Sequence, residues 1–399
     1  MRDNPERVAW AVLGTAFAAF CLIAVAVPLG IRWYLQNAQT DQAAVVESIR
    51  GTVVIELPVG QGAVPLTSGQ SYVVGEGATI KTDESSEAMV TLFEHSPMRI
   101  FPASVVSLLR LRSPRYEASD LPNQVHLDLA GGRIQVGTAL SVETPLSFLV
   151  TTLHADVELE SDGSYALSSN NERGEFAVYR GHAAVTNEHG QVRLEARERS
   201  LVELGSSPGS AIGVAKNWVA NGDFAEGLED WQLLHEQGAD GGDVYGDAEL
   251  TESEGRTAVR FVRSGGHGNH CETILEQSFD QKLPDPVTSL VVRATVKLHE
   301  QSLSGGGYLS SEYPLMIRLT YRDSEDHEGE WVQGFYYQND ANNPTMYGLQ
   351  IPHDRWYLFD SGNLLDSLTR RPYRIIRLRV YASGWDYDSM VSDVSMIVE

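Results

Sequence analysis

Val125-His126-Leu127-Asp128-Leu129 alternates apolar and polar side chains, and Phe176-Ala177-Val178-Tyr179 forms a similar short run. Such alternation is typical of a half-buried β-strand, because successive side chains of a strand point to opposite faces of the sheet. Comparable β-branched runs, separated by Gly, Asp, Asn and Ser, recur from about residue 45 to the end of the chain, without a long amphipathic helical stretch. The chain beyond the N-terminal segment is therefore predicted to be all-β.

The N-terminal segment contains one long apolar run. Residues 8–31 carry no charged side chain, and at about 1.5 Å per residue they predict a helix of roughly 36 Å, enough to span a bilayer. Trp10 and the Trp33-Tyr34 pair lie where interfacial anchors are expected. A cleaved signal peptide is the alternative, since Ala24-Val25-Ala26 fits the cleavage pattern, but its apolar run is usually shorter. We favour a retained transmembrane helix.

The charges around this helix predict its orientation. Arg2 and Arg7 precede it and only Arg32 follows closely, so the positive-inside rule places residues 1–7 in the cytoplasm as a short stub. The expectation is a single-pass plasma-membrane protein with the bulk of the chain extracytoplasmic.

The overall charge excludes one class of function. The chain has 30 Lys and Arg against 54 Asp and Glu, a formal net charge of −24. An acidic surface repels phosphate backbones, so no nucleic-acid partner is expected. Two cysteines, Cys21 in the apolar run and Cys271 far from it, exclude a disulfide scaffold.

A Gly, Ser and Pro stretch divides the rest of the chain. Residues 204–210 read Leu-Gly-Ser-Ser-Pro-Gly-Ser, and tryptophans are concentrated after them. Such a stretch is typical of a linker. We therefore predict two β-domains, 45–205 and 217–399, preceded by a spacer over residues 36–44.

The first of these domains contains a series of short motifs: Gly51-Thr52-Val53, Leu66 to Gly69, Gly77 to Thr82, Ala88, Val90, Leu92, Pro102, Ser104, Leu129 to Val136, Phe148 to Thr152 and Val178 to Val185. The motifs occur in the order found in the FecR-like domain of bacterial envelope proteins, which this domain resembles. The sequence departs from the family at Glu94-His95-Ser96, where an Asp-Gly type turn is usual, and at Arg197, where a Gly is common. The resemblance implies a β-rich module for ligand sensing or for scaffolding with an envelope protein partner. It does not imply sigma-factor control, because the cytoplasmic region that performs it in the family has no counterpart in a stub of this length.

The second domain has a characteristic motif at each end: Asn221-Gly222-Asp223-Phe224 with Trp231 opens it, and a strand around Asp393-Val394 closes it. In this pairing it is similar to carbohydrate-binding modules of the galactose-binding-like, jelly-roll type. This resemblance implies a β-sandwich that binds a polysaccharide or other glycan.

Aromatic side chains are the expected sugar-binding groups, since the flat faces of sugar rings pack on aromatic planes. The alternative for any one of them is a place in the core. The candidates in the second domain are Trp331, Phe335, Tyr336, Tyr337, Tyr347, Trp356, Tyr357, Trp385 and Tyr387, of which we select Trp331, Tyr336, Tyr337, Trp356 and Trp385.

Four arginines oppose apolar residues in strand-like runs and could form a basic patch. If their strands share one sheet, Arg293, Arg318, Arg377 and Arg379 could grip an acidic group by bidentate contacts. A solvated sheet face with cross-strand ion pairs is the alternative.

The jelly-roll resemblance also implies a structural calcium ion where the two ends of the domain meet. Asn221, Asp223 and Asp393 offer the hard oxygen ligands that Ca²⁺ prefers, although Ala225 stands where such modules often have Glu. A second cluster, His267 to Glu272, lacks the partner ligands that a tetrahedral metal site requires.

No catalytic motif is present: the sequence has no Gly-x-Ser-x-Gly, His-Glu-x-x-His or P-loop pattern. We therefore expect a membrane-anchored glycan-binding envelope protein, not an enzyme. The alternative is a structural or signalling scaffold that makes only protein contacts. Exposed aromatics on a sheet face favour the first reading, and their complete burial favours the second.

Overall fold

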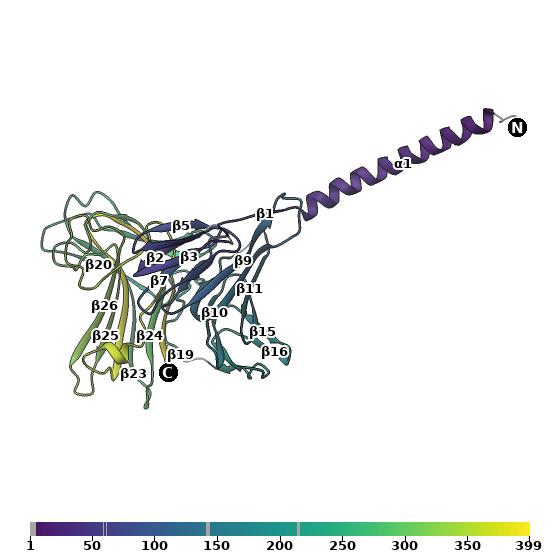
Figure 1. Ribbon diagram of the computed structural model, residues 1–399. Coiled ribbons are helices and arrows are strands. Elements are labelled where there is room, and N and C mark those ends of the chain that lie inside the picture. Colours follow the sequence, from purple (N-terminus) through teal and green to yellow (C-terminus); the bar gives the residue numbers. More distant parts are fainter. Residues whose placement is uncertain (1–4, 59, 61, 141–143, 214–215) are drawn as a thin grey trace.

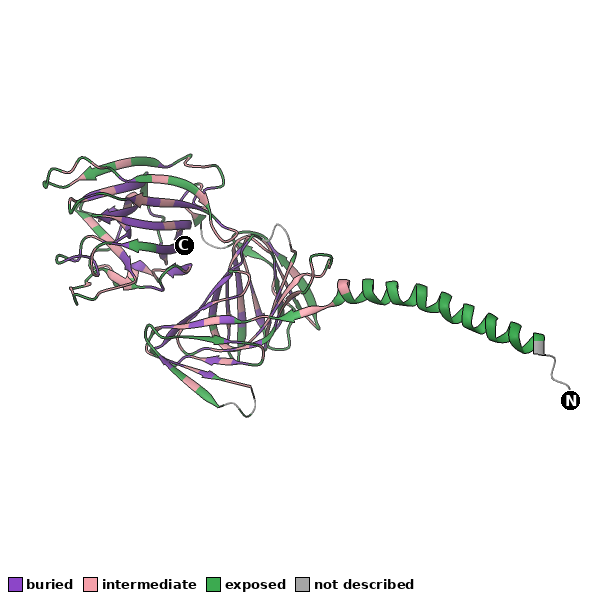
Figure 2. Ribbon diagram, turned by 90° about the horizontal axis from the view of Figure 1, so that it is seen from above, coloured by how far each residue is buried: buried purple, intermediate pink, exposed green. Residues whose placement is uncertain are grey.

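The computed structural model describes residues 5–58, 60, 62–140, 144–213 and 216–399, so most of the predicted cytoplasmic stub lies outside the described residues. The first element is helix α1, Pro5–Asn37, which contains the predicted span 8–31. It projects from the body of the protein, and its residues from Glu6 to Tyr34 are exposed (Figure 2). Within the described residues it is the one helix that is long and apolar enough to cross a membrane, with a mean hydropathy of 2.4 in its most apolar window.

The rest of the chain is almost entirely β-structure, which confirms the predicted fold class of a leading helix followed by β-sheets. We call residues 39–213, which follow helix α1, the first β-unit. Its strands are β1 (Gln39–Asp41), β2 (Ala44–Arg50), β3 (Thr52–Glu56), β4 (Ala63–Thr67), β5 (Ser71–Val74), β6 (Thr79–Lys81), β7 (Glu87–Thr91), β8 (Pro97–Ile100), β9 (Val105–Pro114), β10 (Asn123–Gly137), β11 (Leu146–Thr152), β12 (Asp156–Leu159), β13 (Ser164–Ser169), β14 (Arg173–Arg180), β15 (Ala183–Asn187), β16 (Gly190–Leu194), β17 (Glu198–Glu203) and β18 (Ile212–Gly213).

Two ladders of strands build the first β-unit. One runs β4-β3-β6-β9-β10-β11-β12-β15-β16 and the other β5-β2-β7-β8-β10-β13-β14-β17-β18. The long strand β10 belongs to both, because its first half pairs with β9 and its second half with β8 and β13. Together the ladders close into a barrel-like network.

Glycine permits the bend at which β10 passes from one ladder to the other. Gly132 has φ +97, and a Cβ at this position would lie 2.2 Å from Oγ of Ser104. A side chain here would clash, so the crossing requires glycine.

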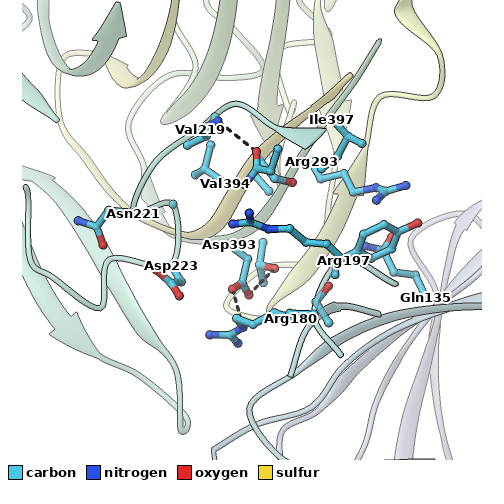
Figure 3. Close-up of a pocket in the computed structure, with 18 residues that line it drawn as sticks. Gln135, Arg180, Arg197, Val219, Asn221, Asp223, Arg293, Asp393, Val394 and Ile397 are labelled. Carbon is cyan, nitrogen blue, oxygen red and sulfur yellow. Dashed lines mark hydrogen bonds and ion pairs between the residues drawn. The ribbon is translucent and has the colours of Figure 1, made fainter. Parts of the chain in front are cut away.

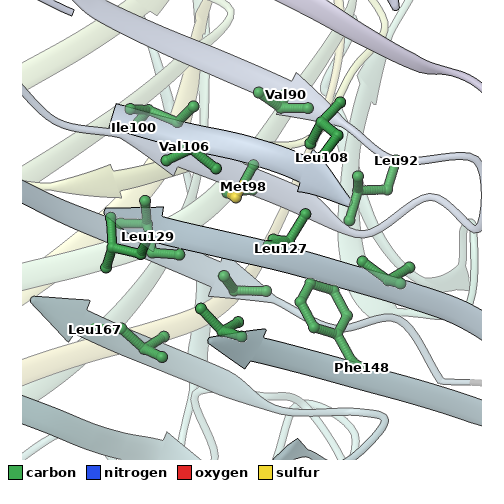
Figure 4. Close-up of a cluster of buried hydrophobic side chains, with 14 of the residues drawn as sticks. Val90, Leu92, Met98, Ile100, Val106, Leu108, Leu127, Leu129, Phe148 and Leu167 are labelled. Carbon is green, nitrogen blue, oxygen red and sulfur yellow. The ribbon is translucent and has the colours of Figure 1, made fainter. Parts of the chain in front are cut away.

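Apolar side chains from both ladders fill the space between them, as Figure 4 shows. Leu127 and Leu129 from the alternating run are fully buried, and so are Ile134 and Val136 from the second half of β10. The alternation that predicted a half-buried strand therefore describes its inward face correctly.

The second β-unit is a sandwich of two sheets. Its strands are β19 (Lys216–Asn217), β20 (Gln232–Gln237), β21 (Asp247–Glu252), β22 (Thr257–Arg263), β23 (Cys271–Lys282), β24 (Leu290–Gln301), β25 (Leu315–Arg322), β26 (Glu328–Tyr336), β27 (Gly348–Gln350), β28 (Tyr357–Asp360), β29 (Arg374–Gly384) and β30 (Tyr387–Val398), with a short helix α2 (Leu364–Ser367). The sheet that faces the first β-unit, which we call the near sheet, has the order β21-β22-β30-β24-β28, with β19 beside β30. The far sheet has the order β20-β23-β29-β25-β26-β27.

The junction between α1 and the first β-unit is a strand and not the predicted spacer. Residues 39–41 form β1, which pairs with the end of β9. Ser119 Oγ donates to the carbonyl of Gln36 at 2.6 Å, and the rings of Tyr34 and Tyr116 lie 6.0 Å apart. The end of the helix is thus tied to the connection that follows β9.

The two β-units pack against each other through a polar interface. Arg256, at 2% exposure, binds the carboxylate of Asp393 and donates to the carbonyl of Gly137 in the first β-unit at 3.3 Å. Arg180 of β14 lies 3.2 Å from the same carboxylate. A buried charge is tolerated only when it is paired, so these contacts hold the units in register.

A second part of the interface joins β7 and β8 to the near sheet. Arg99 pairs with Glu87 at 2.6 Å and donates to the carbonyl of Leu358, while Tyr357 Oη donates to Glu87 at 3.2 Å. Met89 belongs to the hydrophobic core of the second β-unit. A side chain of the first β-unit therefore packs into the core of the second.

The Gly-rich stretch before residue 214 is also ordered against the first β-unit. Gly209 N donates to Leu201 O at 3.0 Å, and Ser200 Oγ donates to Gly209 O at 2.8 Å. The boundaries 45–205 and 217–399 remain predictions about independent folding.

The interface predicts a large cost for removing Arg256. Arg256→Ala deletes one of the guanidinium groups that neutralise Asp393 in a buried place, and we expect a loss of about 3–5 kcal/mol in the free energy of unfolding. Chemical denaturation of the full chain in detergent measures it. Arg374→Ala is the control, because Arg374 pairs with Asp280 at an exposed site and its loss should cost less than about 1 kcal/mol. Equal effects of the two variants would contradict this role of Arg256.

The carboxyl group of Glu94, in the turn between β7 and β8, should make the stability of the fold depend on pH. Both of its carboxylate oxygens are shielded from solvent, and this burial raises its pKa to about 7, against a smaller opposite effect of Ser96. Because the folded state holds the proton more tightly than the unfolded chain, stability falls as pH rises from about 4.5 to 7 and stays low above that. Glu94→Gln should then raise the stability at pH 8 by up to about 3 kcal/mol and have little effect at pH 4. Thermal denaturation at both pH values tests this, with the exposed Glu84→Gln as control; no gain at pH 8 would refute it.

Candidate functional site

The far sheet presents the free face of the second β-unit. Tyr357 and Leu358 of the near sheet contact the first β-unit, and the guanidinium of Arg293 in β24 lies 3.9 Å above the ring of Tyr179 in β14. Strands β23, β25 and β26 of the far sheet lie on the side away from the first β-unit (Figure 1). We call the solvent side of the far sheet, β29 included, the outer face.

Three of the four predicted arginines share this outer face. Arg318 is directly opposite Arg379 in the ladder, and Arg377 is opposite Thr320 two positions along β29. Arg293 does not join them, because β24 belongs to the near sheet, where Arg293 pairs with Asp360 at 2.7 Å. Strand parity identified the face of each arginine, but the assumption of one shared sheet was wrong for Arg293.

The outer face is mixed in charge and not a basic patch. Arg379 lies 2.6 Å from Glu276 and 3.1 Å from Glu236, and Arg377 lies 4.0 Å from Glu276. Arg318 donates to Tyr381 Oη at 2.8 Å. The carboxylates come from β20 and β23, so most of the positive charge is compensated across the strands.

One end of the outer face is apolar and covered by a loop. Ile274, Met316 and Tyr381 form a cluster with Tyr313, which follows the loop 302–312. The Tyr313 ring packs directly on glycine backbone, since a Cβ at Gly334 would lie 2.2 Å from it. The loop therefore lies over this end of the sheet.

The predicted aromatic residues divide between core and surface. Trp356 and Tyr336 are buried, Trp331 is half-buried with its ring 6.2 Å from that of Phe359, and Tyr337 is half-buried beside His353. Trp385 is 40% exposed. Large rings are commonly buried in sandwich cores, and burial removes Trp356 and Tyr336 from any surface that a sugar could reach.

Further exposed aromatics lie on the loops around the outer face. Tyr308 is 83% exposed, Tyr245 58% and Tyr347 47%, and Leu309 and Met346 are exposed beside them in sequence. Tyr347 was among the candidates, whereas Tyr245 and Tyr308 were missed. The Gly305-Gly306-Gly307 run before Tyr308 was the available signal, because such a run places the next side chains on a loop.

Hydrogen bonds join these loops to one another. Asn343 Nδ2 donates to Ser304 O at 2.9 Å, Asp386 N donates to Ser302 Oγ at 2.9 Å, and His270 N donates to Asp240 Oδ2 at 2.9 Å. His270 Nδ1 lies 2.5 Å from Glu312 Oε1. We call the loops 238–246, 264–270, 302–312 and 338–347, with Trp385, the loop rim.

The contact between His270 and Glu312 makes the loop rim sensitive to pH. The hydrogen bond that His270 Nδ1 donates to the Glu312 carboxylate raises the pKa of His270, and burial partly opposes this effect. A raised histidine pKa stabilises the fold fully below about pH 6.5, and this contribution is lost as pH rises through the folded-state value. Hydrogen exchange of the amides in 302–312 should therefore speed up more steeply from pH 6 to pH 9 than the intrinsic exchange rate. The excess should vanish in His270→Gln and persist in the control His189→Gln; an excess that survives in His270→Gln would contradict this.

The predicted calcium ligands do not fit a calcium ion in this arrangement. Both guanidinium groups that contact Asp393, those of Arg256 and Arg180, occupy the place of a cation. The side chain of Asn221 instead closes its own turn, donating to Gly227 O and Glu229 O and accepting from Glu226 N. Among the described residues, no group of three His, Cys, Asp or Glu is arranged to hold a metal ion. The same holds for His267 to Glu272, where His270 pairs with Glu312.

The three predicted calcium ligands nevertheless lie close to one another. Asn221, Asp223 and Asp393 line a cavity of about 270 Å³ between the two β-units, and Arg293 lines it as well (Figure 3). Arg180, Arg197 and Gln135 of the first β-unit line its other side.

The fold and these surfaces define an all-β protein of two packed units behind an apolar helix. No family model matches the chain, and no curated protein matches it. Solved structures that are similar include a candidate anti-sigma factor from Parabacteroides distasonis, with 20% identity and a TM-score of 0.27 over 39% of this chain; the chain spans 66% of that protein's length. They also include the carbohydrate-binding module TmCBM61 in complex with β-1,4-galactotriose (14% identity, 46% of this chain, 100% of the module, TM-score 0.26). A family 11 carbohydrate-binding module from Clostridium thermocellum in complex with a mixed-linked tetrasaccharide is a third (10% identity, 47% and 97% coverage, TM-score 0.28). The structural neighbours thus include both kinds of protein that the sequence resembles.

Proposed function

We propose that the protein is a membrane-anchored envelope protein that binds a glycan at the outer face and loop rim of its second β-unit. The helix α1 would hold it in the plasma membrane with both β-units outside the cell. Its role is then binding and not catalysis.

The exposure of aromatic side chains on the loop rim carries this proposal. Tyr308, Tyr347 and Trp385 lie on loops that are hydrogen-bonded to one another, at the edge of a sheet face that the first β-unit leaves free. Exposed rings held on ordered loops lose little conformational entropy when a sugar ring packs on them. If these rings belonged to the hydrophobic core, they would be buried.

The outer face offers the polar groups that a glycan also needs. Its paired Arg and Glu side chains can donate to and accept from sugar hydroxyls without a large net charge. Because Arg377 and Arg379 are paired with Glu276 and Glu236, the face suits hydroxyl groups better than a free anion.

Polysaccharide binding by the full chain tests the proposal. The chain in detergent is screened on an array of neutral and acidic cell-envelope polysaccharides, and the best ligand is titrated by calorimetry. We expect weak binding, and about a 3- to 10-fold loss of affinity for Trp385→Ala and for Tyr308→Ala, since each stacked ring contributes on the order of 1 kcal/mol.

Tyr72→Ala is the matched control, because Tyr72 is an exposed tyrosine on β5 of the first β-unit. Its affinity should equal that of the unmodified protein, and circular dichroism confirms that each variant is folded. A folded protein that binds no polysaccharide on the array, or a loss in Tyr72→Ala equal to that in Trp385→Ala, would refute the proposal and favour a scaffold that makes only protein contacts.

A further inference from the structure

One arginine that lines the cavity between the two β-units makes no ion pair or side-chain hydrogen bond among the described residues. Arg197 belongs to the turn between β16 and β17, and its side chain extends across the cavity, as Figure 3 shows. It is exposed, and within the described part of the chain no hydrogen bond or ion pair reaches its guanidinium. Arg197 is thus available to a ligand.

The other two arginines of the cavity differ from Arg197 in this respect. Arg180 lies within ion-pair distance of Asp162 and Asp393, at 2.9 and 3.2 Å, and Arg293 pairs with Asp360. Their charges are compensated by the interface itself. Among the described residues, Arg197 is therefore the one arginine of the cavity whose charge no ion pair compensates.

The backbone at Arg197 is in the left-handed region, with φ +70. A residue with a Cβ is less stable there than glycine, so the backbone alone favours Gly at this position. Strain that persists in a non-glycine residue points to a use of its side chain.

Polar groups beside Arg197 also lack partners. Gln135 is 4% exposed and lines the cavity, and its Oε1 has no hydrogen-bond partner among the described residues. The same is true of Nη1 of Arg293. Buried polar groups are costly when unpaired. Both atoms are shielded from solvent in this arrangement, so a ligand hydroxyl would reach them once the two side chains rotate toward the cavity.

We infer that this cavity binds an acidic monosaccharide unit, a uronate, with its carboxylate on Arg197. A guanidinium takes a carboxylate by two parallel hydrogen bonds. Hydroxyl groups of the same ring would reach Gln135, Arg293 and the half-buried carboxylate of Asp223. A volume of about 270 Å³ is at the small end for ligand cavities, which fits one sugar ring better than a chain.

This site is distinct from the outer face, and its occupant would touch both β-units. Binding there would stabilise their packed arrangement, because a ligand that binds only the packed state raises its population.

Calorimetric titration of the full chain in detergent with D-glucuronate tests the inference. D-Glucose and inorganic phosphate are the comparison ligands, because they offer the hydroxyls or the charge alone. We expect glucuronate to bind at least 10-fold more tightly than either and to raise the melting temperature.

Arg197→Gly is the decisive variant. It removes the guanidinium and relieves the backbone strain, so the melting temperature without ligand should not fall, while glucuronate binding weakens at least 10-fold. Arg173→Ala, an exposed arginine of β14, is the matched control and should bind as the unmodified protein does. Trp385→Ala should also keep glucuronate affinity, which separates this site from the loop rim.

Several results would overturn the inference. They are absence of glucuronate binding, glucose or phosphate binding as tightly as glucuronate, and unchanged affinity in Arg197→Gly.

Discussion

The pairing of Asp393 with two guanidinium groups is the interaction on which the arrangement of the two β-units depends. One guanidinium, Arg256, comes from the second β-unit, and the other, Arg180, comes from the first. Loss of either arginine would leave the remaining buried charges without full compensation, which is costly where water is excluded. This constraint holds β10 and β14 against β24 and β30, and it thereby creates both the covered near sheet and the cavity beside it. The outer face is free for the same reason: the near sheet is occupied.

Local pattern was sufficient for much of the fold. The alternation in residues 125–129 identified an inward face that is buried in the barrel-like network, and the apolar run of residues 8–31 identified the helix. Parity also placed Arg318, Arg377 and Arg379 on one face. Each of these inferences needs only neighbours in sequence, since the direction of a side chain follows from the period of its own element.

The features that the sequence could not show depend on long-range pairing. The cationic partners of Asp393, which was predicted as a calcium ligand, lie 137 and more than 200 positions earlier in the chain, in elements whose sheet membership the sequence does not show. Arg293 was grouped with the other arginines because parity reports the face of a strand but not the sheet. The sequence gives no sign that Trp356 is buried and Trp385 exposed. The difference comes from their places in the fold, because Trp356 precedes β28, which packs against the first β-unit, and Trp385 lies in the turn before β30.

The junction at Gln36 and Ser119 has a mechanical consequence. Because β1 follows α1 almost directly and is paired with β9, the chain has no slack between helix and β-structure. The two β-units are in turn joined by buried ion pairs, so the far sheet is connected to α1 through ordered structure. A sideways pull on the far sheet then acts as a lever on the helix, tilting or rotating it, and is not absorbed by a flexible tether.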